Sequence, residues 1–557
     1  MSTVAELELW PKPSPPPSSI SPSRLPGSTY ESTKALLEVL KLNHERWHVF
    51  YDDNGRHNHI SHHVLAVWAM GAHKDIISMG YKKNEHMMKP RRSSPEPITQ
   101  ENFNDHLGDH SYYDAYLRFF TEELRSKGPS STLEEYIFSP KVNFGTISKH
   151  GDHPSMLSRF VAALMHALIH VGYGAEFGLP GMFVQGLAMA AGSRSGSNQI
   201  LPPALFRDID LLRENSRYVG LKSLQSTANA SYGNGNDGQG PNSFMDVFSS
   251  NEVPNQPAPT STPSLNLAAP RLAAVVSALS GGADPRTNVT AKNVHAFDVI
   301  ARIINDPNVR PQKTGLQMIY GSVLEECGDA IYRYASEWSP DVSSVSAKIE
   351  ELQWTAALLY AVSGFRQLEG GEFNADFLAM HFVTSALFLP SLAVYLSVPS
   401  QILLLRSHFV VCLTWWVAIG KAHLDIPAFF AADTAHPGPS GTRPTVNKRA
   451  LPAPQSPIAI NPNPWTYIIQ QAITHPDDHV PKLLRALMHF SVLYGEREAG
   501  FFGGTELRDA DKIDGTLFIR AAGLTVERLT REFREVPDEQ VYWDRKTYIP
   551  GAPHGSY

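Results

Sequence analysis

The chain has 557 residues, of which 42% are hydrophobic and 18% are charged, and its formal net charge is −7. This composition supplies ample material for a large core, and its interspersed charges form no basic stripe or charged tail, which excludes nucleic acid or a membrane surface as an expected partner. Two cysteines exclude a disulfide framework and, with no signal sequence at the amino terminus, predict a cytoplasmic protein.

Stretches of biased composition divide the chain. Residues 1–28 are rich in proline and serine and predict a disordered arm. Residues 226–270 and 433–464 are long, polar and rich in Gly, Asn, Ser or Pro, which predicts disordered insertions. The remainder of 29–495 is expected to form one large domain, with 496–557 as a carboxyl-terminal extension packed on it.

A helical period of apolar residues dominates the rest, and alternating strand patterns are hard to find. Residues 156–177 are apolar nearly all round, which predicts a single helix buried on every side. We therefore predict an all-α protein. The expected helical segments are 31–42, 59–80, 112–125, 156–177, 293–304, 317–337, 347–366, 376–397, 401–420 and 481–494.

Two of these segments, 377–398 and 401–420, are apolar and long enough to form a transmembrane hairpin. They carry His381, Arg406 and His408, however, and ionisable groups at that density are costly in lipid. Buried core helices are therefore expected instead.

Histidine is unusually abundant, with 23 copies, and several of them are closely spaced in the sequence. Two histidines four residues apart on a helix lie on one face, so that both reach one ion. Burying neutral imidazoles without partners costs a few kcal/mol, so that something must satisfy them. We predict a metal site from two such pairs and two histidines on further apolar helices: His59, His63, His166, His170, His381 and His408.

Imidazole ligands suit iron, zinc or copper, and the absence of cysteine from the cluster argues against a structural zinc. Tyr173 and Glu176 follow on the stripe of His166, and they are candidates to orient an imidazole or to contact a phenolic substrate. The alternatives are that Tyr173 belongs to a turn that ends the helix, and that His381 and His408 are hydrogen-bonded core residues.

Several blocks of sequence resemble the questin oxidase-like family of fungi. The resemblance extends over about 43–425 and 465–492. The blocks are HNHISHHVLAVWAMGA (57–72), YLRFFTEEL (116–124), FVAALMHALIHVGYGAEFGLPG (160–181), DFLAMHFVTSALFLPSL (376–392) and HVPKLLRALMHF (479–490).

This resemblance implies a mostly helical oxidoreductase of polyketide metabolism that opens anthraquinone-like aromatic polyketides with O₂ by a Baeyer–Villiger-type oxygen insertion. It implies NADPH as electron donor in some members, and in others non-haem Fe(II) held by histidines and a modified lysine. The lysine expected after the His381 helix is replaced here by His408, with Lys421 downstream. The positions that match the family's histidines are His59, His63 (or His62), His166, His170 and His381.

The sequence is therefore compatible with three functions. The favoured one is an iron-dependent oxygenase. The others are a metal-free, NADPH-dependent oxidase in which histidines act as acids and bases, and a catalytically degenerate helical scaffold. The sequence leaves open the exact substrate and whether the protein forms a homo-oligomer.

Overall fold

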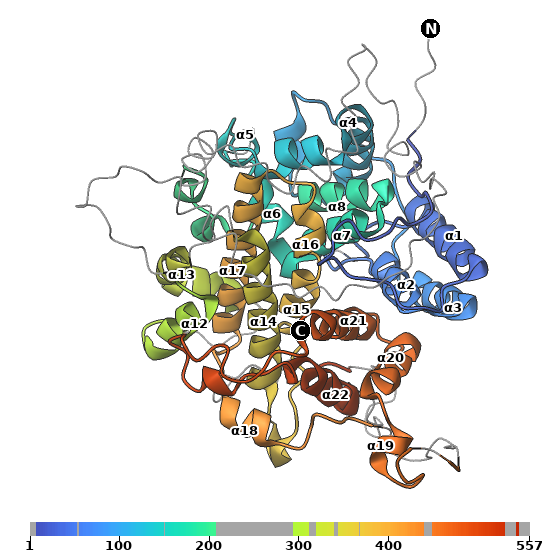
Figure 1. Cartoon of the computed structure of the whole chain (residues 1–557). Helices are drawn as coiled ribbons and strands as arrows, with labels where there is room; N and C mark the ends of the chain where they lie inside the picture. The colour runs from blue at the N-terminus through green and yellow to red at the C-terminus, as the bar shows by residue number, and fades with distance from the viewer. Residues whose placement is uncertain are drawn as a thin grey trace, which may run out of the picture.

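A computed structural model gives the structure of most of the chain (Figure 1). The predicted insertion at 226–270 lies outside the described residues, as does part of 433–464. The structure describes residues 7–52, 55–149, 151–207, 293–310, 319–338, 344–366, 368–438, 448–449, 451–529 and 542–544.

Within these ranges the fold is all-α, as predicted: the described residues contain helices, turns and three isolated β-bridges, and no strand. The helices are α1 (Tyr30–Arg46), α2 (Ile60–Ala69), α3 (Lys74–Glu85), α4 (Tyr113–Leu133), α5 (Lys141–Phe144), α6 (Met156–Phe160), α7 (Ala162–Phe177), α8 (Pro180–Gly192), α12 (Ala296–Asn305), α13 (Ile319–Glu337), α14 (Val345–Gly364), α15 (Met380–Ala386), α16 (Leu389–Ala393), α17 (Val398–Ala418), α18 (Ile426–Ala431), α19 (Pro457–Ile460), α20 (Pro464–Thr474), α21 (His479–Tyr494) and α22 (Leu517–Leu529). Short 3₁₀ turns are η1 (Phe103–His106), η2 (His110–Tyr112), η4 (Asn198–Ile200), η5 (Glu369–Gly371) and η6 (Ala510–Lys512), and η3 (Glu134–Phe138) is a π turn.

Four helices pack in a closed ring near the centre of the molecule (Figure 1). In this ring α2 contacts α7, α7 contacts α15, α15 contacts α21, and α21 returns to α2. The outer helices cover it: α1 and α3 pack on α2, α8 packs on α7, α14 packs on α15, and α20 and α22 pack on α21. The ring positions the candidate site described below.

Glycines let the helices around α7 approach closely. A Cβ built at Gly186 of α8 would lie 2.5 Å from Val171 Cγ2 of α7, and a Cβ built at Gly172 would lie 2.4 Å from Phe388 Cβ. Atoms at such distances overlap, so both contacts require the absence of a side chain.

The helix predicted over 156–177 is wrong in one respect, because it breaks after α6. Ala163, Leu164 and Met165 adopt left-handed backbone angles, with φ of 45°, 59° and 63°. This conformation costs a residue with a Cβ roughly 1–2 kcal/mol, so the surrounding packing must hold it. The turn directs the carbonyl of Ala163 to His166 Nδ1, and this bond fixes the orientation of the His166 ring. The apolar periodicity of the sequence does not predict such a bond.

The amino-terminal arm is also different from the prediction, because residues 7–28 are packed rather than disordered. Trp10 is 5% exposed and lies against Gly181 of α8. The Ser14 amide donates to the Phe177 carbonyl at 2.9 Å. Proline restricts the unfolded chain, so ordering this segment costs less entropy, and one buried tryptophan contributes a large apolar area.

Helix α17 is the one described helix that is long and apolar enough to cross a membrane by length and composition. In this structure 89% of its apolar window is buried inside the molecule, against α13 and α14 among others, as expected for a core helix.

The close contact at Gly172 gives a test of the fold. Gly172→Ala places a methyl group on Phe388, and we expect it to lower the free energy of unfolding by about 1–3 kcal/mol. Gly321→Ala is the matched control, because a Cβ at this exposed position of α13 meets nothing within 4 Å. Denaturant unfolding measures both variants, and equal stability of the two would contradict the packing described here.

Candidate metal centre

Four histidines lie close together, one at each helix of the ring. Each lies where regular helix begins: His59 is the N-cap of α2, His166 follows the left-handed turn of α7, His381 is the second residue of α15, and His479 is the first residue of α21. Because the same helices contact one another in a ring, their histidines meet although 420 residues of sequence separate the first from the last.

The four imidazoles also contact one another in a closed cycle. The ring centroids of His59 and His166 are 4.8 Å apart, and those of His166 and His381 are 5.0 Å apart. His381 lies 5.5 Å from His479, and His479 lies 4.7 Å from His59. One ligand nitrogen from each of His59, His166 and His479 lies within 4.8 Å of the others, close enough to share an ion after small side-chain movements.

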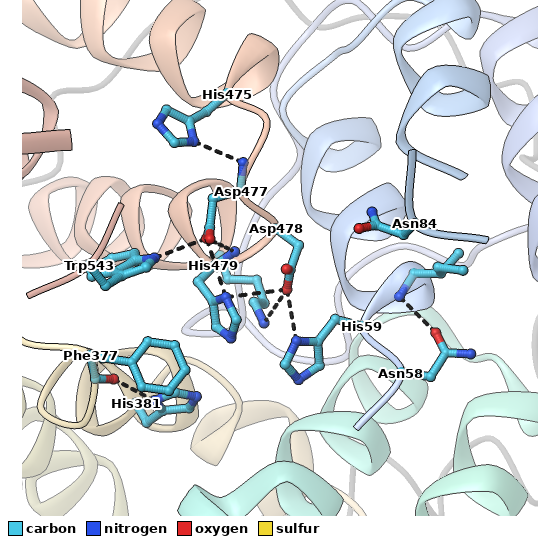
Figure 2. A network of polar contacts seen from close by, with 12 residues as sticks. Asn58, His59, Asn84, Phe377, His381, His475, Asp477, Asp478, His479 and Trp543 are labelled. Carbon is cyan, nitrogen blue, oxygen red and sulfur yellow. Dashed lines mark hydrogen bonds and ion pairs between the residues drawn. The ribbon is translucent and has the colours of Figure 1, made fainter. Parts of the chain in front are cut away.

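On every one of the four rings, the Nδ1 atom has an acceptor. His59 Nδ1 lies 2.9 Å from Asp478 Oδ2, and His479 Nδ1 lies 3.2 Å from Asp477 Oδ1 (Figure 2). His381 Nδ1 lies 2.8 Å from the carbonyl oxygen of its own helix at Phe377, and His166 Nδ1 bonds to the Ala163 carbonyl. An acceptor at Nδ1 fixes the tautomer that carries the proton there and leaves Nε2 with its lone pair.

The Nε2 atoms of His59, His166, His381 and His479 are all buried, and none has a hydrogen-bond partner among the described residues. Burial lowers the pKa of His59 to about 3 and the pKa values of His166 and His381 well below the usual 6.5. The imidazoles of His59, His166 and His381 are therefore neutral at physiological pH, the form that binds a metal. Nitrogens of His59, His166 and His479 lie close enough to share an ion, and the ring of His381, with its unpartnered Nε2, packs against two of them.

Two carboxylates and a lysine lie beside the histidines. Asp478 lies between His59 and His479 in Figure 2, and Lys482 Nζ is 3.1 Å from Asp478 Oδ2. Although burial disfavours its charged form, the neighbouring His479 and Lys482 hold the pKa of Asp478 well below its usual range. Burial also lowers the pKa of Lys482, although the negative charge of Asp478 acts to raise it. The half-buried carboxylates would offset the charge of a bound cation.

A cavity of about 600 Å³ opens beside this group, and His59, His166 and His479 line it. Its walls are mostly apolar and aromatic, and include Met88, Phe377, Trp415 and Trp543. Trp543 comes from the carboxyl-terminal extension and donates from Nε1 to Asp477 Oδ1 at 2.9 Å (Figure 2). The volume and lining fit a flat aromatic molecule.

The structure brings together three of the six histidines predicted as ligands, namely His59, His166 and His381. The other three have different neighbours. His63 packs against Gly80 of α3, and His408 Nε2 bonds to Ser385 Oγ at 2.9 Å. The i,i+4 argument does not bring His63 to the site because His59 caps α2 rather than lying inside it.

His170 belongs to a separate network of hydrogen bonds that does not include the four histidines. Its Nδ1 lies 2.9 Å from His62 Nε2, and its Nε2 lies 2.9 Å from Gln185 Oε1. The Gln185 amide then donates to His44 Nδ1 at 2.9 Å. Both nitrogens of His170, the second imidazole of the predicted His166/His170 pair, are therefore hydrogen-bonded within this network. A buried imidazole needs a partner, and for His170 the partner is a hydrogen-bonding side chain rather than an ion.

The two residues proposed as catalytic lie in the core behind the histidines. Glu176 forms an ion pair with Arg485 of α21, and both side chains are at most 1% exposed. The Tyr173 ring stacks on His62, with centroids 5.2 Å apart, and packs against Phe388. Neither residue lines the cavity beside the four histidines.

The prediction missed His479, Asp478 and Lys482. All three fall in or beside the block HVPKLLRALMHF, which was recognised but not assigned a role. A signal was present, since His479 follows two aspartates at a helix start and Lys482 lies one turn later. The spacing rule overlooked it because the position four residues after His479 is Leu483, and the other histidine of the helix, His489, lies ten residues away.

The family model described as Questin oxidase-like matches residues 56–487. A Baeyer-Villiger monooxygenase, dmxR6, of Cryptosporiopsis sp. is 22% identical over 507 residues, 88% of each chain.

Shorter alignments join the chain to other relatives. The Baeyer-Villiger monooxygenase AacuH of Aspergillus aculeatus is 30% identical over 185 residues, 31% of this chain and 36% of that protein. The questin oxidase of Aspergillus fumigatus is 29% identical over 163 residues, 28% of this chain and 35% of that protein. These alignments cover about a third of each relative's length.

The buried pair of Arg485 and Glu176 gives a test that separates structure from catalysis. Removing one partner, as in Arg485→Met or Glu176→Leu, leaves a buried charge and is expected to lower the free energy of unfolding by about 3–5 kcal/mol. The double variant replaces both charges by apolar groups and should recover most of that loss, as measured by denaturant unfolding. A stable double variant that has lost all turnover would instead assign Glu176 to the chemistry.

Proposed function

Because the matching family model spans most of the chain, the protein belongs to the questin oxidase-like family, and we propose that it is a fungal oxidoreductase of secondary metabolism. More specifically, we propose a non-haem iron oxygenase that inserts oxygen beside a ring carbonyl of an anthraquinone-like aromatic polyketide. The insertion gives a lactone, and addition of water to its ester bond opens the ring. Several relatives carry the name Baeyer-Villiger monooxygenase or oxidase, which supports this class of reaction.

One observation carries the metal in this proposal. Four buried Nε2 atoms, of His59, His166, His381 and His479, have no partner among the described residues, while each Nδ1 has an acceptor. A neutral donor set of this kind fits ferrous iron better than the oxygen-ligated ions Mg²⁺ and Ca²⁺. When bound, iron would supply the redox chemistry through which O₂ reacts with an organic substrate.

The resemblance implies a modified lysine among the iron ligands, and we propose Lys482 for it. Lys482 is 4% exposed, lies one turn after His479, and has a pKa lowered by burial, which favours the reactive neutral amine. Lys421 is a poorer candidate, because its Nζ donates to the carbonyls of Ile303 and Asp306, both at 2.9 Å. His408 is hydrogen-bonded to Ser385 instead.

The chain's own residues would bind and orient the substrate. Phe377, Trp415 and Trp543 offer flat apolar surfaces in the cavity beside the histidines. Trp543 is held by its bond to Asp477, so it would cover a bound ring and exclude water.

The electron balance requires a reductant for a single oxygen insertion. One oxygen atom of O₂ enters the ring and the other leaves as water, which consumes two electrons and two protons. We propose NADPH as the donor of these electrons. Turnover should then consume NADPH and O₂ in equal amounts, as measured by absorbance and an oxygen electrode.

Metal analysis tests the proposed ligand set. Protein purified anaerobically without a metal-affinity column should contain about one iron per chain. His381→Ala and His479→Ala should lose most of that iron together with ring-opening activity, because each removes one of the four buried Nε2 atoms that have no partner among the described residues. His63→Gln is the matched control, since His63 is a buried histidine of the same region outside the set, and it should keep its iron.

Two results would overturn the iron assignment. Full activity with NADPH after chelation would favour a metal-free oxidase. Loss of iron in His63→Gln, with iron retained in His479→Ala, would contradict the proposed ligands.

A further inference from the structure

A second cavity of about 490 Å³ adjoins the one beside the four histidines. The two cavities share Gly55, His57, Ala163 and Trp415 as walls. His57 is also stacked on the metal-site residue His166, with ring centroids 4.4 Å apart. A ligand lying along the Trp415 wall would therefore have one end beside the histidines and the other end in the second cavity.

The second cavity differs in charge from the first. Asp477 and Asp478 line the first cavity, whereas the second has no carboxylate among its lining residues. Its one permanently charged lining residue is Arg194, and no described carboxylate forms an ion pair with it. Arg194 is exposed at the edge of this cavity, and its charge contributes, after burial, to lowering the pKa of His110 in the same cavity.

The segment that carries Arg194 is held on both sides. The buried guanidinium of Arg159 donates to the Ser193 carbonyl, and the Ser197 amide donates to Ser158 Oγ at 2.9 Å. Ser197 Oγ lies 2.8 Å from the Tyr320 hydroxyl. An arginine on a fixed backbone loses less entropy when it binds a ligand than one on a mobile loop.

An aromatic wall connects this segment with the histidines. The Tyr320 ring stacks on Trp415 with centroids 4.4 Å apart and an interplanar angle of 29°. Tyr320 lines the second cavity, and Trp415 lines both. The connected space thus combines an apolar, aromatic part with a cationic end.

We propose that the segment 193–197, through Arg194, forms an anion-binding subsite for a carboxylate or phosphate group of a ligand whose aromatic part lies along Trp415. The planar guanidinium can bind both oxygens of such a group with two parallel hydrogen bonds. The anion has two sources, a carboxylate on the aromatic substrate or the phosphate of a nicotinamide dinucleotide. The inference rests on the proposed function only for the identity of the ligand, because binding is measurable without turnover.

Calorimetric titration of the full chain with 2-naphthoate and its neutral analogue 2-naphthamide tests the subsite. We expect 2-naphthoate to bind about tenfold more tightly or better, because only the carboxylate can form charge-assisted bonds to Arg194. Arg194→Gln should abolish this preference, and Arg194→Lys should retain part of it. Arg333→Gln is the matched control, because Arg333 is an exposed arginine of α13 outside both cavities, and it should bind like the unchanged protein.

A titration with NADP⁺ distinguishes the two sources of the anion. Binding of NADP⁺ that is lost in Arg194→Gln assigns the subsite to a dinucleotide phosphate, whereas Arg194-dependent binding of 2-naphthoate alone assigns it to a substrate carboxylate. If neither probe depends on Arg194, the proposal is overturned. The same titrations in His381→Ala separate this result from the iron assignment, because the subsite should still bind after iron is lost.

Discussion

The structure depends on one constraint: four imidazoles from four helices must pack against one another inside the protein, each with one nitrogen already bonded. Nδ1 of each ring is occupied by a carboxylate or a backbone carbonyl, and each Nε2 is buried without a partner among the described residues. This arrangement is only available if four helices begin at one place, and the closed ring of α2, α7, α15 and α21 provides it. The left-handed turn before His166 and the two aspartates before α21 both serve this geometry.

This geometry lowers the free energy of unfolding. Polar nitrogens buried without a partner each cost on the order of 1–3 kcal/mol, and the left-handed turn adds to that cost. The apolar helices α7, α8, α14 and α17, which are buried on nearly every side, supply the offsetting stability. Local cost concentrated at one point of a well-packed protein is typical of a functional site, where a ligand relieves part of it.

Both ends of the described chain contribute to the enclosure of this region. The amino-terminal arm buries Trp10 against α8, and the carboxyl-terminal residue Trp543 closes the cavity beside the histidines. Local sequence patterns do not predict either contact, because a single tryptophan in a polar or proline-rich segment has no periodicity from which its partner could be read. The expectation of a disordered arm failed for this reason, whereas the helices α14, α17 and α21 were predicted from their apolar residues. The single helices predicted over 59–80 and 376–397 are wrong, because each of these segments forms two helices.

The sequence by itself determined the all-α class, the core position of α17, and the presence of histidines that burial forces to find partners. Tertiary structure alone decided which histidines are packed together. A spacing of four residues selects a face of one helix, yet the set consists of one histidine from each of four helix ends. His479 therefore joined His59, His166 and His381, while His170 found its partner in Gln185 and His408 found its own in Ser385. The reason is physical: local spacing fixes directions within a helix, and only packing fixes where helix ends meet.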